Sequence, residues 1–343
     1  MIVRSVTLED FDQLWGLIEQ ATYGMTTLQI TREQLRERVE LSNFAFSRST
    51  EKASGDPYVF VMEDEATSKL VGLSCIFSKT GGFEPFYSYR RMVETSYSEL
   101  LDKTVETEFL QLAKIHDGPT EIGSLFLLPD FRGKGRGRLL SLSRFAFIAA
   151  HPMRFDSQVI AEMRGIMSDD GKCVFWEAIG RHFFAIDFPQ ADSLSTLNKR
   201  FIENLMPKHS IYTCLLSEEA QAIMGKVHEN TRPALAMLQS EGFEISDLID
   251  IFDGGPVVQC PRDEIKAVRR CQERQVSAKV IDQDATGNES NIVSSHRDGF
   301  RACLTQTRYD SDDKIMLTRA AAAALRVEAG QTVRSMSLYP QAE

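Results

Sequence analysis

Residues 121–138 read Glu-Ile-Gly-Ser-Leu-Phe-Leu-Leu-Pro-Asp-Phe-Arg-Gly-Lys-Gly-Arg-Gly-Arg. The apolar first half predicts a strand that ends at Pro129, and the apolar residues 139–150 predict a helix. Between them glycines alternate with basic residues, and no acid occurs from Arg132 to Arg138. Glycines let backbone N–H groups converge, and a helix start adds unpaired donors and partial positive charge. The stretch therefore predicts a site for a phosphate-bearing ligand.

The glycine pattern narrows the type of phosphate site. It lacks the Gly-Lys-Ser/Thr ending of a nucleotide-binding P-loop, and it lacks the G-x-G-x-x-G order of dinucleotide-binding folds. The order Arg132-x-x-Gly135-x-Gly137 instead resembles the R-x-x-G-x-G/A signature of GNAT acyltransferases, which surrounds the pyrophosphate of acyl-CoA. A tight connection with a solvated basic rim is the alternative that this short pattern leaves open.

Composition limits the function classes. The chain has 343 residues, of which 43% are hydrophobic and 26% charged, and these proportions are ordinary for a globular protein. A net charge of −10 argues against a general nucleic-acid binder, so the basic turn favours a small anionic ligand. Six scattered cysteines form no C-x-x-C pair, which argues against zinc ribbons and disulfide scaffolds. We find no signal-peptide pattern and no membrane-span pattern, and we expect a cytoplasmic protein.

The order of predicted elements indicates the fold class. Residues 2–6 read as a strand, helices are expected from Thr7 and over 31–43, and strands 58–63 and 69–78 read as a hairpin. The strand–turn–helix stretch then leads to an apolar strand at 159–165, expected parallel to the first strand. We therefore expect an α/β (α+β) fold, with a GNAT-like mixed twisted sheet flanked by helices.

The remaining segments complete the domain prediction. Residues 81–91 read as an aromatic loop that lines a pocket or covers the core, residues 175–184 and 233–242 as helices, and residues 262–275 as a charged helical stretch. Residues 249–257 predict a strand that ends in an acidic glycine turn, and residues 278–295 predict a mobile loop. The tail reads as a small β-rich, barrel-like module. We predict an acyltransferase domain over residues 1–275 and this module over 276–343.

Six stretches, in order along almost the whole chain, together resemble the arginine N-succinyltransferase family, and they are residues 58–64, 125–132, 159–165, 203–209, 225–228 and 249–256. The resemblance implies a GNAT-type enzyme of arginine catabolism. Such an enzyme transfers succinyl from succinyl-CoA to the α-amine of L-arginine, which yields CoA and N2-succinyl-L-arginine, and some members accept ornithine. It also implies that the strand at Leu125 contacts succinyl-CoA and that His228 is the proton donor.

The reaction requires particular groups. Backbone amides near Leu125, Phe126 and Leu127 are candidates for stabilising the developing oxyanion. The cofactor-binding candidates in the turn are Arg132, Gly133, Lys134, Gly135, Arg136 and Gly137. The carboxylates of arginine and of the succinyl group require guanidinium partners, and the substrate guanidinium requires carboxylates. The substrate-binding candidates are therefore Arg90, Arg164, Glu162, Asp250 and Asp253.

Other assignments stay open. Glu162 and Arg164 lie two positions apart on one face of a strand, which fits a polar pocket or a structural ion pair equally. The enzyme could be a related amino-acid or amine acyltransferase that uses ornithine or acetyl-CoA, and the chain could be a non-catalytic subunit that binds CoA or arginine. Succinyl-CoA is expected as a co-substrate, with no permanently bound cofactor and no metal. We expect no nucleic-acid or membrane partner, and a homo-oligomer or a hetero-oligomer with a similar chain.

Overall fold

A computed structural model describes residues 1–20, 25–168, 170–197, 200–282, 289–297 and 299–339. Its strands are β1 Ile2–Ser5, β2 Pro57–Asp64, β3 Lys69–Phe77, β4 Gly81–Ser98, β5 Lys103–Asp117, β6 Thr120–Leu127, β7 Gln158–Glu162, β8 Ile211–Tyr212, β9 Glu244–Ile249, β10 Pro256–Pro261, β11 Gln272–Val280, β12 Glu289–Ser295, β13 Arg301–Tyr309, β14 Ile315–Leu317 and β15 Thr332–Ser337. Its α-helices are α1 Phe11–Ile18, α2 Arg32–Ser47, α3 Arg136–Ala150, α4 Val174–Ala178, α5 Gly180–Phe184, α6 Phe188–Leu197, α7 Arg200–Leu205, α8 Glu218–Ile223, α9 Arg232–Ser240, α10 Lys266–Arg270 and α11 Arg319–Leu325.

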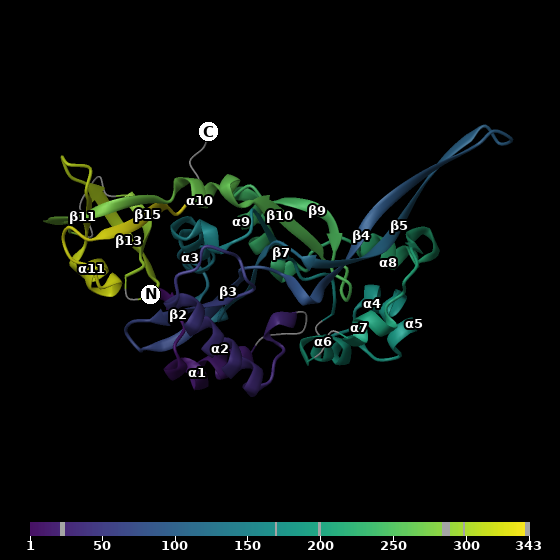
Figure 1. Cartoon of the computed structure of the whole chain (residues 1–343), viewed down its shortest axis with the longest axis horizontal. Coiled ribbons are helices and arrows are strands. Elements are labelled where there is room, and N and C mark those ends of the chain that lie inside the picture. Colours follow the sequence, from purple (N-terminus) through teal and green to yellow (C-terminus); the bar gives the residue numbers. More distant parts are fainter. Residues whose placement is uncertain (21–24, 169, 198–199, 283–288, 298, 340–343) are drawn as a thin grey trace.

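The main sheet runs in the order β1-β2-β3-β6-β7-β10-β9-β4-β5-β8, and helices cover both of its faces (Figure 1). Its strand β2 is apolar at every position from 58 to 62, as expected of a strand buried on both sides. Val59 and Val61 belong to the core beneath α1 and α2, whereas Tyr58, Phe60 and Met62 belong to the core beneath α3. The predicted mixed sheet flanked by helices is confirmed.

Local signals placed several elements correctly. The Thr31 side chain accepts a hydrogen bond from the Gln34 backbone amide, and this cap starts α2 one residue later. Strands β2 and β3 pair antiparallel across the acidic turn, which confirms the predicted hairpin. The first helix begins as a 3₁₀ turn at Leu8–Asp10 that leads into α1.

The C-terminal strands close on themselves. The order β12-β15-β11-β14-β13 is completed by pairing between β12 and β13, which gives the predicted barrel-like module its own apolar core. Strand β13 also pairs with β1, so the barrel is hydrogen-bonded to the main sheet. Strand β11 spans positions 275 and 276, where we drew the boundary between the two domains, and that division stays a prediction.

Five sequence-based assignments were wrong or incomplete. The strand expected at 249–257 is instead the turn between β9, which ends at Ile249, and β10, which begins at Pro256. Residues 81–91 are not a loop but the first half of strand β4. Only Lys266–Arg270 of the stretch 262–275 is α-helical, because β11 begins at Gln272 and pairs with β15. The helix expected at 175–184 is divided into α4 and α5 at Ile179. Of the expected loop 278–295, residues 278–280 belong to β11 and 289–295 to β12, while 283–288 lie outside the described residues.

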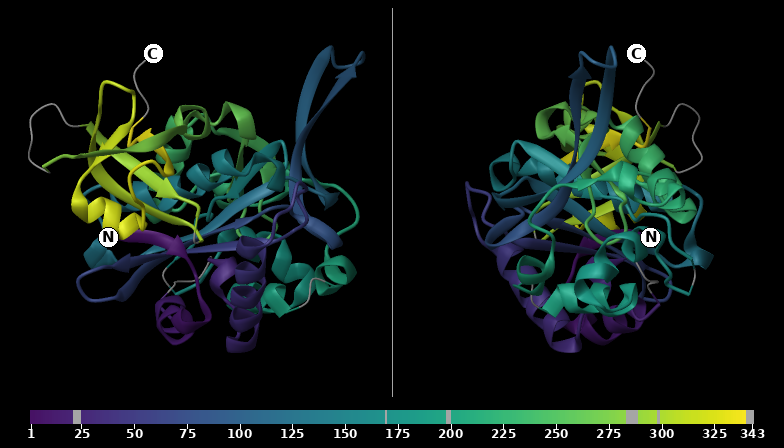
Figure 2. Two further views of the ribbon diagram at one scale, coloured as in Figure 1. Left: turned by 60° about the vertical axis from the view of Figure 1, so that its left-hand side comes forward. Right: turned by 90° about the vertical axis from the view of Figure 1, so that its right-hand side faces the viewer.

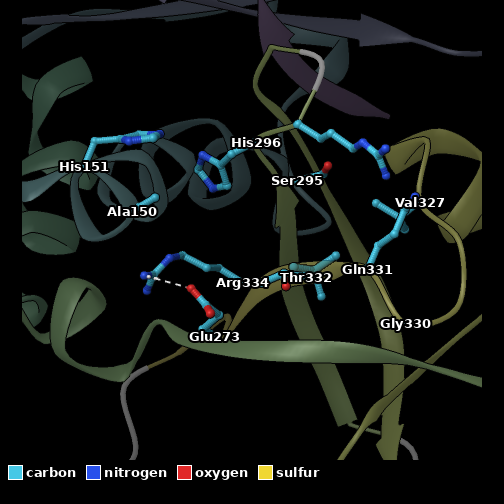
Figure 3. Close-up of a pocket in the computed structure, with 12 residues that line it drawn as sticks. Ala150, His151, Glu273, Ser295, His296, Val327, Gly330, Gln331, Thr332 and Arg334 are labelled. Carbon is cyan, nitrogen blue, oxygen red and sulfur yellow. Dashed lines mark hydrogen bonds and ion pairs between the residues drawn. The ribbon is translucent and has the colours of Figure 1, made fainter. Parts of the chain in front are cut away.

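A cavity of about 420 Å³ separates the end of α3 from the barrel, and His151, His296 and Arg334 lie around it (Figure 3). The two imidazoles meet edge to face at 5.3 Å, and the His296 ring stacks on Phe147. Burial, aided by Arg154 and Arg334, lowers the pKa of His151 to about 4. Burial, aided by His151 and Arg334, lowers the pKa of His296 to about 3.

These two histidines predict a pH-dependent stability. An unfolded histidine titrates near 6.5, so below that pH the unfolded state binds more protons than the folded state, and stability falls as the pH falls toward 4. We expect a loss on the order of 2 kcal/mol in the free energy of unfolding, reduced by the partial solvent access of His151. Urea unfolding at several pH values measures it. His296→Phe, which keeps a ring against Phe147, should flatten the profile, and an unchanged slope would contradict the assignment.

Candidate active site

Strands β6 and β7 are parallel neighbours for only a short distance. Their paired residues are Thr120 with Val159 and Glu121 with Ile160. Beyond this point β6 continues to Leu127 without further pairing to β7 among the described residues. Residues 122–127 therefore have no β7 partner on that side, at the carboxyl ends of two neighbouring parallel strands. Ligands of open α/β sheets bind at such strand ends.

A β-bulge changes the course of β6 within this unpaired part. Register with β3 shifts between the pair Cys75–Gly123 and the pair Leu73–Phe126, and Ser124 has a φ of 52°. The Ser124 hydroxyl donates to Thr27 Oγ1 at 2.8 Å, which ties the bulge to the segment between α1 and α2. Bulges redirect side chains and interrupt pairing next to functional sites. The predicted acyl-CoA contacts Leu125, Phe126 and Leu127 follow directly after it.

The glycine turn leads from β6 into α3. Gly133, Lys134 and Gly135 have consecutive positive φ values of 88°, 50° and 74°, and Gly135 is the residue that precedes the helix. Glycine has no side chain with which to cap the first amides of α3; the Arg136 amide donates to the Gly133 carbonyl at 3.1 Å, and the amides of Gly137 and Arg138 lie at the positive end of a 15-residue helix. This arrangement is a site for an anion such as a diphosphate.

The space around the glycine turn at 132–137 is open on one side and filled by the barrel on the other. A Cβ atom at Gly133 or Gly137 would meet no atom within 4 Å, whereas a Cβ at Gly135 would lie 3.0 Å from Leu338 of the barrel side. Arg132 and Lys134 are exposed, and the Arg132 Nε donates to the Leu127 carbonyl at 3.3 Å. An anion therefore has access from the side of Gly133 and Gly137.

The remaining basic residues of the turn are used within the protein. The Arg136 guanidinium donates to the Phe131 carbonyl at 3.5 Å. Arg138 forms an ion pair of 2.9 Å with Glu241, whose side chain is fully buried and also pairs with Arg270 at 2.5 Å. Arg138 thus connects α3 to the ends of α9 and α10 rather than adding charge to the anion site.

His228 lies beside the end of β7. Val227 forms an antiparallel bridge with Gly165, and the His228 amide donates to the Arg164 carbonyl at 2.9 Å. A turn of 3₁₀ helix at Glu229–Thr231 and then α9 follow it. The structure therefore brings His228 next to the strand end that flanks the unpaired part of β6.

The tautomer of His228 is fixed by its own turn. The Asn230 backbone amide donates to His228 Nδ1 at 3.2 Å. A backbone N–H can only donate, so Nδ1 must accept through its lone pair. The proton of the neutral imidazole is then on Nε2, and that nitrogen is the donor that the ring presents beyond its own turn.

Glu162 and Arg164 continue the line of β7. Buried and half-buried residues alternate from Ala161 to Met167, and both charged residues are half-buried. This alternation places the two side chains on one face, as their spacing predicts. The Arg164 carbonyl also holds the His228 segment, so both candidates lie at the strand end that carries the proposed proton donor.

Asp250 and Asp253 hold the turn between β9 and β10. The Asp253 carboxylate accepts the amides of Gly165 at 2.7 Å and Gly255 at 2.8 Å, and Asp250 Oδ1 accepts the amides of Phe252 and Asp253. Burial, with the neighbouring Asp250 carboxylate, raises the pKa of Asp253 well above its usual value. Asp253 thus lies against the His228 strand end through Gly165, and a role for either carboxylate in binding substrate is untested.

Arg90 is separate from this cluster. It lies on β4 and forms a half-exposed ion pair with Asp247 on β9, at 2.5 Å. In the sheet, β9 and β10 lie between its strand and β7. Glu162, Arg164 and His228 lie at the end of β7, the sheet neighbour of the strand that carries Leu125–Leu127 and leads into the turn 132–137, whereas Arg90 lies away from this strand end.

Two arginines near the bulge were not predicted. Arg144 of α3 is buried and donates to the Gly123 carbonyl at 3.3 Å and to the carbonyl and hydroxyl of Ser141. Burial lowers the pKa of Arg144 to about 10. Arg38 of α2 donates to the Thr27 carbonyl at 2.5 Å on the other face of the sheet. In the sequence, Arg144 stands out because it is a charged residue within the apolar run 139–150, and this position could have revealed it.

The described residues contain no group of three or more His, Cys, Asp and Glu side chains that could hold a metal ion. None of the helices in the described part of the chain is long and apolar enough to cross a membrane.

Comparisons with known proteins agree with this architecture. Residues 1–267 match the family model described as arginine N-succinyltransferase beta subunit, and residues 272–337 match the model of its C-terminal domain. The chain is 40% identical to arginine N-succinyltransferase of Yersinia pseudotuberculosis serotype O:3 (strain YPIII), over 99% of this chain and 98% of the relative. It is also 40% identical to arginine N-succinyltransferase subunit beta of Pseudomonas aeruginosa, over 99% of each chain.

A solved structure extends the agreement to the fold. Arginine/ornithine succinyltransferase subunit AI from Pseudomonas aeruginosa superimposes with a TM-score of 0.88 at 29% identity, over 98% of both chains. The matched regions include the barrel as well as the main sheet. The chain therefore belongs to the arginine N-succinyltransferase beta subunit family.

Proposed function

We propose that this protein transfers a succinyl group from succinyl-CoA to the α-amine of L-arginine, which yields CoA and N2-succinyl-L-arginine. The observation that carries the proposal is the match to arginine N-succinyltransferases over 99% of the chain. The reaction is a step of arginine catabolism, and free cysteine thiols are consistent with a cytoplasmic enzyme.

The co-substrate would be bound at the start of α3. Amides of residues 133–137 and the positive end of the helix would hold the diphosphate of succinyl-CoA, with Arg132, Lys134 and Arg136 adding positive charge. The pantetheine chain would then follow the unpaired edge of β6 beside Leu125–Leu127. Amides after the bulge are the candidates for donating to the oxyanion of the tetrahedral intermediate.

The transfer itself requires little covalent chemistry from the protein. The neutral α-amine attacks the thioester carbonyl, an N–C bond forms, and the C–S bond breaks as the carbonyl re-forms. The attacking nitrogen loses a proton and the sulfur of CoA gains one, so protons balance once the ammonium has been deprotonated. Nε2–H of His228 would donate a hydrogen bond to the departing sulfur as its negative charge develops, and the proton that the sulfur finally takes is balanced by the one that the attacking nitrogen releases. Such assistance contributes roughly 10²–10⁴-fold in rate.

The charged ends of both substrates need partners near His228. Arg164 is the better placed of the two proposed guanidinium groups, because its backbone already contacts His228, whereas two strands, β10 and β9, separate β7 from the strand of Arg90. Glu162 on the same face is the candidate for the substrate guanidinium. Arg164 would bind a substrate carboxylate and Glu162 the substrate guanidinium, at the separation that their positions on the strand set.

Release of free CoA tests the function and its rivals. We expect rapid thiol release from succinyl-CoA when L-arginine is present and little release without it. L-Ornithine and acetyl-CoA serve as the comparison substrates, and mass spectrometry of the product identifies the succinylated nitrogen. Release with acetyl-CoA alone would favour another acyltransferase, and binding of CoA without release would favour a non-catalytic subunit.

A further inference from the structure

A long two-stranded arm extends from the main sheet. Strands β4 and β5 pair from Gly81–Asp117 to Ser98–Lys103, and Figures 1 and 2 show their outer ends standing away from the body. Strand β9 pairs with β4 only at Tyr89 and Arg90, and β8 pairs with β5 only at Phe109 and Leu110. Residues 91–108, called the arm below, therefore have no neighbouring strand on either edge in the described structure.

The arm exposes several large apolar side chains. Leu100 and Leu101 at its tip are 95% and 72% exposed, and Val93 and Tyr97 behind the tip are 62% and 61% exposed. An isolated two-stranded ribbon is marginally stable in water, and exposed edges and apolar patches of this kind mark interaction surfaces. The arm has 18 residues, close to the 20 to 30 residues that one side of a standard interface contributes.

A matching apolar surface lies at the base of the arm. Tyr212 of β8 and Leu215 just after it are 41% and 81% exposed, and we call these two residues the root patch. The patch is attached to the arm, because the Tyr212 ring contacts Phe109 and Thr213 Oγ1 donates to the Glu108 carbonyl. The same chain thus carries an exposed apolar tip and, one arm length away, an exposed apolar patch.

Charge also favours contact between the tip and the root patch. The arm carries five acids and two bases, and its acids are Glu94, Glu99, Asp102, Glu106 and Glu108. Lys208, exposed just before β8, lies on the root side. Two arms lying side by side in the same direction would bring Glu99 and Asp102 of both tips together, whereas an antiparallel arrangement would bring these two tip acids near Lys208, and the root acid Glu108 is already paired with Arg91.

We propose that the arm docks on a second copy of this chain, in a two-fold dimer in which the two arms lie antiparallel. In this arrangement the tip of each arm covers the root patch of its partner. The interface is self-complementary, as two-fold symmetry requires, and the free strand edges of the arms face one another. The inference concerns assembly, and it does not depend on the proposed reaction.

Oligomeric state in solution tests the proposal first. Light scattering or sedimentation should show the purified protein as a dimer, or as a larger assembly built from dimers, at micromolar concentration. Leu100→Glu combined with Leu101→Glu should weaken the dimer at least about tenfold without unfolding the monomer, since both side chains are exposed. Leu41→Glu, on an exposed site of α2, is the matched control. A monomeric wild type, or a variant that dimerises normally, would overturn the proposal.

Mixing two variants tests the tip-to-root contact itself. The proposed dimer has two identical contacts, each between one tip and one root patch. Leu215→Glu alters the root patch in both contacts, so it should weaken the dimer as the tip variant does. A mixture of the tip variant and Leu215→Glu contains heterodimers in which one of the two contacts is entirely wild type. Recovery of dimer in the mixture supports the arrangement, and its absence together with normal folding of both variants rejects it.

A native cysteine provides a positional test. Cys214, next to Leu215, is exposed, and the other five cysteines are buried. Leu100→Cys should therefore form an intermolecular disulfide with Cys214 of the partner subunit under mild oxidation, giving about twice the 38.7 kDa chain mass on a non-reducing gel. Adding Cys214→Ser to this variant should remove that product, as should placing the new cysteine at Leu41. A product that persists without Cys214 would show that tips meet tips instead.

Discussion

Replacing His228 with alanine is expected to lower kcat by roughly 10²–10⁴-fold while leaving the KM for succinyl-CoA nearly unchanged. The ring is held at the end of β7 by backbone contacts to Arg164 and Gly165, and its Nδ1 accepts the Asn230 amide. Removing it takes away the Nε2–H donor but none of the turn at 132–137. Steady-state kinetics with succinyl-CoA as the varied substrate, at saturating L-arginine, separates the two parameters.

Two further variants decide whether the loss is chemical. His228→Gln keeps a side-chain N–H donor, so it should retain more activity than the alanine variant. His182→Ala removes an exposed histidine from α5 and should change nothing. Thermal unfolding of all three controls for folding. Wild-type turnover in His228→Ala would remove this residue from the mechanism and leave leaving-group protonation to solvent.

The strand–turn–helix unit at 121–150 was predictable because its signals are local. An apolar run, a proline exit, clustered glycines and a second apolar run determine the backbone over neighbouring residues. The same holds for the Thr31 cap and the β2–β3 hairpin, whose residues lie close together in sequence. The bulge at Ser124 was not predictable, because it arises from register against β3, a strand about 50 residues earlier.

Non-local pairing explains the failures. Residues 81–91 contain two glycines and a proline, which favour a loop, yet the strand forms because β5 pairs with Gly81 and then continuously from Phe86 to Ser98. The turn at the tip, Glu99 to Asp102, contains no Gly, Pro or Asn, so no turn signal revealed a hairpin there. Residue Gln272 continues a charged helical pattern but joins β11, whose partner β15 lies at the end of the chain.

In the candidate site, too, the features built by neighbouring residues were predictable and those built by distant residues were not. The anion site was visible in the sequence because one turn and one helix start build it. His228 had no local signature, and only the bridge between Val227 and Gly165 explains how it reaches the end of β7. Asp253 resembles a surface carboxylate in sequence, but in the structure it is buried against the amides of Gly165 and Gly255.

Gly137→Asp is expected to raise the KM for succinyl-CoA by roughly 100-fold with little change in kcat at saturation. A carboxylate in the first turn of α3 would compete with the diphosphate for the same amides and repel it. The fold should tolerate the change, because a Cβ at this position meets no atom within 4 Å and an acid near a helix N-terminus stabilises the helix. Kinetics with succinyl-CoA varied, and thermal unfolding in parallel, measure both effects.

Gly137→Ala is the matched control, since it adds the same Cβ without the charge and fits the G/A position of the acyl-CoA signature. It should keep the wild-type KM. Gly135 cannot serve this purpose, because its φ of 74° and the 3.0 Å approach of Leu338 would make any side chain there destabilising. If Gly137→Asp and Gly137→Ala bind succinyl-CoA equally well, the diphosphate does not lie at the start of α3. If only the aspartate variant fails and it unfolds no earlier than wild type, the loss can be assigned to charge at the anion site.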